Sequence, residues 1–162
     1  MNVPDRRRMV LIDTNVFLRI FVKENEHMFQ ECREVLELVS HAIIAAYTNT
    51  IVLTEIQFVL TTIYRYPRER IKEALESVLS VPNIKITDDT NARSATDAYG
   101  KTTIKFADCL LASSKLIQEG KAAILSYDRD FDKLGVKRIE PTDLFRKSTR
   151  VASRSGTGWT RA

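Results

Sequence analysis

The sequence predicts an α/β protein of three layers (α/β/α), in which helices cover both faces of a central parallel sheet of four to five strands. Short apolar runs without polar alternation recur along the chain, as is typical of strands that are buried on both faces. These runs alternate with longer segments of helical spacing, which favours strand–helix–strand units. A length of 162 residues favours a single domain.

The first half of the chain contains two predicted strands and four predicted helices. The first strand, at 9–13, ends in an acid, and either Asp13 or Thr14 can cap the helix that follows. The second strand is the apolar run AIIAAYT. The further helices are predicted at 27–40, from Thr50 to about Tyr66, and from Pro67 to about Ser80.

The second half continues the alternation with shorter elements. Strands are predicted at 83–87, 122–126 and 136–139. Helices are predicted at 90–99, ended by Gly100, and at 105–119, followed by Gly120, with a short helical turn at 128–135. The predicted organisation is a basic arm at 1–8, a folded domain at 9–145 and a flexible basic tail at 146–162.

Composition limits the classes of protein that the chain can belong to. The formal net charge of +4 is compatible with a polyanion partner, although charge alone does not separate that from an ordinary soluble protein. Cys32 and Cys109 lie in apolar helical patterns and are expected to be reduced core residues of a cytoplasmic protein. No apolar stretch approaches the ~20 residues that a membrane span requires.

Four acidic residues lie at the end of, or inside, apolar stretches, where ionised side chains are rarely found unless they are paired or bind a metal. They are Asp13, Glu55, Asp108 and Asp128. Each has a simpler explanation alone: a helix cap, a surface ion pair, a favourable charge at a helix N-terminus or a turn residue. Asp13 and Asp128 both directly follow strands, so both are expected at the carboxyl edge of the sheet, where ligands bind.

The four acids together favour a shared cation site. Two carboxylates about 4 Å apart repel each other by ~4 kcal/mol at an effective dielectric constant of 20. A cluster of carboxylates without a matching protein cation is therefore typical of a hard-cation site, for Mg²⁺ or Mn²⁺.

The segments LIDTNVFL, LTEI, KFADCLLA and LSYDRDFDKLG, in this order, resemble the PIN-domain ribonuclease family and its VapC-like toxins. The resemblance covers roughly residues 9–145 and implies that the four acids coordinate one or two Mg²⁺ or Mn²⁺ ions. It also implies that Asn15 supports the first acid and that Ser126 precedes the last acidic motif. Asp130 is a second candidate in that motif, ranked below Asp128.

The resemblance further implies metal-dependent hydrolysis of single-stranded or loop RNA by activated water. VapC-like members are toxins that a small antitoxin protein silences, and they are usually homodimers. The alternatives are a PIN nuclease of RNA processing and a PIN-like module that binds RNA or protein without cleaving. A phosphatase of the haloacid-dehalogenase type is less favoured, because it requires D-x-D where this chain has Asp13-Thr14-Asn15.

Several other polar residues are candidates for a site, and most have a simpler explanation. Arg65, Arg68 and Arg70 form a basic cluster that either contacts phosphates or is a solvated face. Asp88, Asp89 and Asp97 are better explained as caps or solvated helix residues, and Tyr47, Tyr64 and Tyr66 by packing. His27 and His41 have no nucleophile pattern around them.

Overall fold

The computed structural model describes residues 9–145, so the predicted arm at 1–8 and tail at 146–162 lie outside the described residues. Its centre is a sheet of five parallel strands in the order β3-β2-β1-β4-β5. The strands are β1 (Met9–Ile12), β2 (Ala45–Thr48), β3 (Ile84–Ile86), β4 (Ala122–Leu125) and β5 (Arg138–Ile139).

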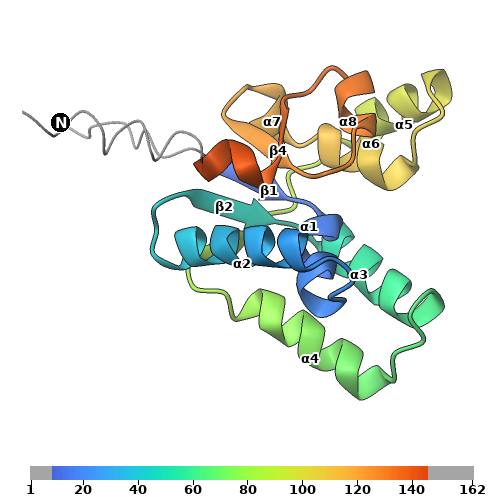
Figure 1. Ribbon diagram of the computed structural model, residues 1–162. Helices are drawn as coiled ribbons and strands as arrows, with labels where there is room; N and C mark the ends of the chain where they lie inside the picture. Colours follow the sequence, from blue (N-terminus) through green and yellow to red (C-terminus); the bar gives the residue numbers. More distant parts are fainter. Residues whose placement is uncertain (1–8, 146–162) are drawn as a thin grey trace, which may run out of the picture.

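Helices cover both faces of this sheet, which confirms the predicted three-layer α/β/α architecture. Figure 1 shows α1 to α4 together on one side of the sheet and α5 to α8 on the other. The first group is α1 (Thr14–Phe21), α2 (Glu26–Ser40), α3 (Thr50–Thr62) and α4 (Arg68–Leu79). The second group is α5 (Ala92–Lys101), α6 (Phe106–Ala112), α7 (Lys115–Gln118) and α8 (Asp130–Lys133).

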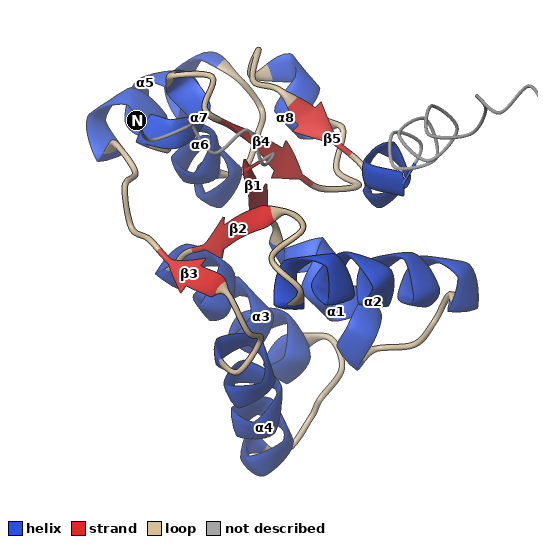
Figure 2. Cartoon of the chain, turned by 90° about the vertical axis from the view of Figure 1, so that its left-hand side faces the viewer, coloured by secondary structure: helices blue, strands red, loops and turns tan. Residues whose placement is uncertain are grey.

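The order of the strands creates a switch point at the centre of the sheet. From β1 the chain steps outward to β2 and β3, then returns to place β4 on the other side of β1, with β5 beyond it (Figure 2). Since parallel crossovers are right-handed, the two directions of travel put their helices on opposite faces. The chain therefore leaves the carboxyl ends of β1 and β4 in opposite directions. Ligands of open α/β sheets bind at such a point, beyond the carboxyl ends of the two strands.

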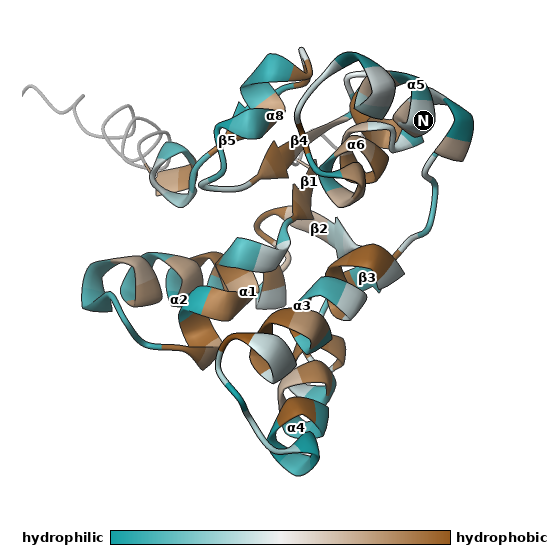
Figure 3. Ribbon diagram, turned by 90° about the vertical axis from the view of Figure 1, so that its right-hand side faces the viewer, coloured by the Kyte–Doolittle hydropathy of each residue, from teal (hydrophilic) through white to brown (hydrophobic). Residues whose placement is uncertain are grey.

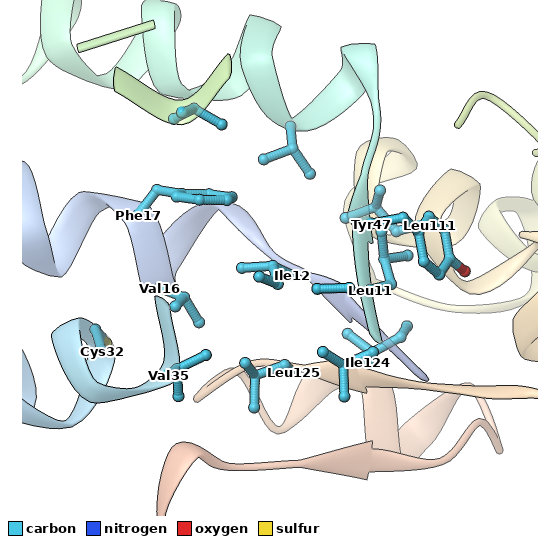
Figure 4. Packing of buried hydrophobic residues seen from close by; sticks show 14 of the residues in the cluster. Leu11, Ile12, Val16, Phe17, Cys32, Val35, Tyr47, Leu111, Ile124 and Leu125 are labelled. Carbon is cyan, nitrogen blue, oxygen red and sulfur yellow. The ribbon is translucent and has the colours of Figure 1, made fainter. Parts of the chain in front are cut away.

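The two central strands carry the main hydrophobic core. Leu11, Ile12, Ile124 and Leu125 have no exposed surface. Figure 4 shows these side chains between Val16, Phe17 and Val35 on one side and Leu111 on the other. Burial on both faces explains why β1 and β4 read as continuous apolar runs rather than alternating ones. None of the helices within residues 9–145 is long and apolar enough to cross a membrane.

Helix α3 has apolar residues outside the side that faces the core. Val52, Ile56 and Leu60 face the core, yet Phe58 is 60% exposed, and Ile63, which caps the helix, is 67% exposed. Figure 3 shows brown, apolar segments on the outside of this helix. A helix that is buried on one side usually has polar residues on the other, so part of this face is unusual for a monomer surface.

The predicted single helix at 105–119 is wrong, because the chain breaks it into α6 and α7 at Ser113 and Ser114. Ser114 is fully buried, and its hydroxyl bonds to Tyr47 Oη at 2.8 Å and donates to Asp89 Oδ2 at 3.0 Å. Asp89 Oδ2 also accepts from the amide of Leu116. These tertiary contacts provide hydrogen-bond partners for polar groups at the start of α7. They therefore stabilise the break between α6 and α7 over one continuous helix.

Other element ends also differ from the prediction in ways that local contacts explain. Gly100 lies inside α5, which ends at Lys101, whereas Gly120 has φ +67° after α7, as a helix-ending glycine does. Asn49, rather than Thr50, caps α3 by accepting a hydrogen bond from the amide of Val52.

Two more boundaries lie at residues with left-handed backbone. The predicted strand at 42–48 begins only at Ala45, because Ala42 has φ +55° and turns the chain. Arg65 likewise has φ +55°, and α3 ends at Thr62 rather than near Tyr66.

The capping role of Asp89 gives a stability prediction. Asp89→Ala removes the acceptor of two hydrogen bonds at the start of α7, so it should lower the free energy of unfolding by about 1–2 kcal/mol. Asp97→Ala, at an exposed position of α5, is the matched control and should change it by less than about 0.5 kcal/mol. Urea unfolding monitored by circular dichroism measures both, and equal effects would contradict the capping role.

Candidate functional site

Asp13 lies at the carboxyl end of β1, at the switch point of the sheet. It is 4% exposed and is the N-cap of α1, where its Oδ1 accepts a hydrogen bond of 2.7 Å from the amide of Thr14. Its own amide donates to the carbonyl of Leu125 at the end of β4. The first acid is therefore fixed to both central strands.

A polar network holds the second carboxylate oxygen of Asp13. Its Oδ2 accepts from Ser126 Oγ at 2.7 Å and from Asn15 Nδ2 at 2.8 Å. Asn15 Nδ2 also donates to Ser126 Oγ at 2.8 Å, and Asn15 Oδ1 accepts from the amide of Tyr127. Both hydrogens of the amide group and the hydroxyl hydrogen of Ser126 are thus used. Asn15 and Ser126 thus both contact Asp13, and their supporting roles in a reaction stay a prediction.

Glu55 reaches this network from α3, on the same side of the sheet as α1. Thr14 Oγ1 donates to Glu55 Oε2 at 2.9 Å, although the two residues are 41 positions apart in the chain. Thr14 is itself 7% exposed. The residue after the first acid therefore orients the second acid.

Asp108 enters from the opposite layer, in the first turn of α6. It is 2% exposed, and its Oδ2 is buried without a hydrogen-bond partner among the described residues. The nearest cation is the ammonium of Lys105, whose Nζ lies 3.6 Å from that oxygen. This distance makes an ion pair but is too long for a hydrogen bond.

Asp128 lies in the loop that follows β4 and is half-buried. Its amide donates to Ser126 Oγ at 2.9 Å, and its Oδ1 accepts from the amide of Asp130 at 2.9 Å. Asp130 points its own carboxylate at Lys133 Nζ, 2.6 Å away. The ranking of Asp128 above Asp130 as the acid of the last motif stays a prediction.

The electrostatic environment ties the four carboxylates together. Burial raises the pKa of Asp13 from 3.8 to about 7; hydrogen bonds from Ser126 and Thr14 oppose the rise, and the charges of Asp108 and Glu55 add to it. Burial likewise raises the pKa of Asp108 to about 6, with Lys105 opposing and the charges of Glu55 and Asp128 adding. All four acids therefore lie close enough for each to perturb at least one of the others.

The oxygens of this cluster fit a divalent cation that keeps much of its water. No three acidic, histidine or cysteine side chains of residues 9–145 are close enough to enclose an ion directly. Mg²⁺ is typically bound through one or two carboxylates and several waters, so a ready-made cage is not required. The unpartnered Oδ2 of buried Asp108 is an acceptor that such an ion or its water would satisfy.

Some residues considered from the sequence lie away from the cluster. Arg65, Arg68 and Arg70 lie where α3 turns into α4, at the far end of α3 from the sheet, and Arg70 stacks on Tyr66 at 4.3 Å (Figure 1). Their contact with RNA stays a prediction. Asp88 accepts from the amide of Thr50 and Asp89 caps α7, so both have the structural roles that were expected.

Three residues that sequence reasoning missed contact the cluster or its loop. Lys105 pairs with Asp108, a contact that their spacing of three residues on a helix could have indicated. Tyr127 Oη donates to Glu31 Oε2 of α2 at 2.7 Å, and Glu31 is 9% exposed. This bond ties the loop between Ser126 and Asp128 to α2, and no sequence signal marks a pair 96 residues apart.

Comparison with known proteins gives three similarities. A PIN domain family model matches residues 10–137. A VapC ribonuclease from Aquifex aeolicus (strain VF5) is 29% identical over 133 residues, which is 82% of this chain and 97% of the relative. The crystal structure of VapBC2 from Rickettsia felis bound to a promoter DNA fragment superposes with a TM-score of 0.58 at 20% identity, covering 82% of this chain and 98% of that one.

The raised pKa values predict how stability depends on pH without metal. In the folded protein the pKa of Asp13 is about 7 and that of Asp108 about 6, both above the ordinary value of 3.8. Both carboxyl groups therefore bind protons more tightly in the folded state than in the unfolded chain. The folded protein therefore holds more protons between about pH 4 and pH 7, so its free energy of unfolding should fall as pH rises through this window.

Substitution of Asp13 separates its contribution to the pH dependence of stability from that of the other titrating groups. With a chelator present, Asp13→Asn should flatten the fall of the free energy of unfolding between pH 4 and pH 7, because the variant lacks one of the two groups that release a proton in this window. Urea unfolding at a series of pH values measures this. A variant that keeps the parent's slope would contradict burial of Asp13 as the cause.

Proposed function

The chain belongs to the PIN domain family, and from that premise we propose that it is a metal-dependent endoribonuclease that cleaves single-stranded or loop RNA. The observation that carries the proposal is buried Asp13, bonded to Asn15 and Ser126 across the ends of β1 and β4. The charges of Glu55 and Asp108 reach it from opposite layers of the fold. A binding module has no need of such mutually repelling groups.

In this proposal the chain's own residues divide the work by their burial. Asp13 and Asp108 are nearly inaccessible and anchor the cation from the two layers. Glu55 and Asp128 are half-buried, so their carboxylates can hold and orient water in the hydration shell and accept its proton. Asn15 and Ser126 keep Asp13 in one orientation, with its charge directed at the site.

A bound Mg²⁺ or Mn²⁺ would supply a Lewis acid that lowers the pKa of water and stabilises negative charge on the phosphodiester. Hydrolysis by in-line attack of water would leave a 5′-phosphate and a 3′-hydroxyl. Burial keeps the pKa of Asp13 and Asp108 high while the site lacks a cation, and a divalent charge would favour their ionised forms.

We propose further that the protein is the toxin of a toxin–antitoxin pair. Support comes from the VapC ribonuclease relative, which this chain matches over 97% of the relative's length. The corresponding partners are a small antitoxin protein, which would block the acid cluster, and a second copy of this chain in a homodimer. The exposed Phe58 and Ile63 at the outer face of α3 are compatible with a covered surface.

The nuclease proposal predicts the effect of neutralising single acids. Asp13→Asn and Asp108→Asn should each lower the rate of RNA cleavage in Mg²⁺ or Mn²⁺ by at least about 100-fold while the protein stays folded. Asp97→Asn, on α5, removes the same charge and should leave the rate unchanged. Gel analysis of a labelled single-stranded RNA, with circular dichroism of each variant, measures both properties.

The same variants separate the proposed functions. An Asp13→Asn variant that cleaves RNA like the parent would rule out the mechanism. Cleavage by the parent with no growth arrest when it is expressed without a partner protein would favour an RNA-processing nuclease over a toxin. Mn²⁺ binding without cleavage would favour a module that only binds RNA or protein.

A further inference from the structure

Lys105 places a positive charge at the acid cluster, in a position that the proposed reaction has not used. It is the N-cap residue of α6, three positions before Asp108. Its Nζ lies 3.6 Å from Asp108 Oδ2, the buried oxygen to which no group of residues 9–145 donates a hydrogen bond. The ammonium is thus the charge partner of the most isolated carboxylate oxygen of the cluster.

The two partners of this ion pair differ sharply in accessibility. The side chain of Asp108 is 3% exposed and fixed by its burial, whereas that of Lys105 is 66% exposed. An ammonium on a flexible four-carbon stem can take several positions, and no hydrogen bond holds it against the carboxylate. Lys105 can therefore leave Asp108 without disturbing the core.

Lys105 also responds to the whole cluster. Burial alone lowers the pKa of Lys105, but the charges of Asp108, Glu55, Asp128 and Asp13 raise it overall. Lys133, which belongs to the last acidic motif, donates a hydrogen bond to Asp130 instead. The ammonium of Lys105 consequently lies where both a divalent cation and the phosphate of a bound RNA would have to approach.

We propose that Lys105 is a resident cation of the acid cluster, which moves off Asp108 when a divalent ion binds and then contacts a phosphate of the bound RNA. The inference rests on the proposed nuclease function and adds a phosphate-contacting residue to it. The positive charge of Lys105 competes with the divalent ion for Asp108, and it also attracts the phosphate of the RNA. The first effect weakens metal binding, whereas the second promotes cleavage. Loss of the charge should strengthen metal binding and weaken cleavage.

The first measurement follows metal binding without any reaction. Lys105→Gln keeps a polar side chain of similar reach but removes the charge, so Mn²⁺ should stabilise this variant at about threefold to tenfold lower concentration than it stabilises the parent. Thermal unfolding over a Mn²⁺ titration at low salt gives this shift. Lys101→Gln, the matched control at the end of α5, should bind Mn²⁺ like the parent, because no ion pair links Lys101 to the described acids.

The second measurement follows cleavage at saturating Mn²⁺, where differences in metal affinity no longer matter. Lys105→Gln should lower kcat/KM for a single-stranded RNA by about tenfold or more, and Lys105→Arg should recover most of that loss. Lys101→Gln should stay within about twofold of the parent. A residue that only supports the fold would not give tighter metal binding together with slower cleavage.

Each other outcome overturns the inference in a defined way. Unchanged Mn²⁺ affinity in Lys105→Gln would show that Lys105 does not compete for the cluster. Tighter Mn²⁺ binding with unchanged cleavage would show that the ammonium does not contact the RNA. In both cases the parent binds Mn²⁺ and cleaves, so the proposed function survives; a parent that does neither would remove both proposals together.

Discussion

The buried hydrogen bonds between Asp13, Asn15 and Ser126 are the constraint on which the rest of the site depends. They join the carboxyl ends of β1 and β4, the two strands from which the chain departs in opposite directions. A carboxylate that is 4% exposed is costly unless its oxygens are satisfied, and here three donors satisfy them. The network therefore fixes both a strand junction and the position of a charge.

The remaining acids are brought to this junction by the two layers of helices. Thr14 extends the network by donating a hydrogen bond to Glu55 in α3, and Asp108 lies in α6 on the other face of the sheet. Mutual repulsion and burial make the cluster unfavourable while it has no divalent cation, as the raised pKa values of Asp13 and Asp108 indicate. Buried acids with raised pKa values are typical of functional sites, where stability is lower than it could be.

Much of this arrangement could be predicted from the sequence because its causes are local. The unbroken apolar runs of β1 and β4 predict buried parallel strands, and Asp13 and Asp128 follow those runs directly, so a common edge was foreseeable. Asn15 and Ser126 both donate hydrogen bonds to the first acid, and their roles in a reaction stay a prediction. The resemblance to the PIN domain family is confirmed by the match over residues 10–137.

What could not be predicted depends on contacts between distant segments. The break between α6 and α7 follows from the bonds that Ser114 makes with Tyr47 and Asp89, and helical periodicity does not report them. The tie between Tyr127 and Glu31 likewise joins residues 96 positions apart. Tertiary contacts of this kind override local preference at helix ends, and they also decide which polar residues reach the site.

We propose that carboxylates from both layers converge on a single divalent ion beside the ends of β1 and β4. A crystal structure of the protein soaked in Mn²⁺, with anomalous scattering recorded, tests it most directly. We expect an anomalous peak next to Asp13 and Asp108, with Glu55 and Asp128 contacting the ion directly or through water. A peak bound elsewhere, or these four side chains directed to separate regions, would contradict it.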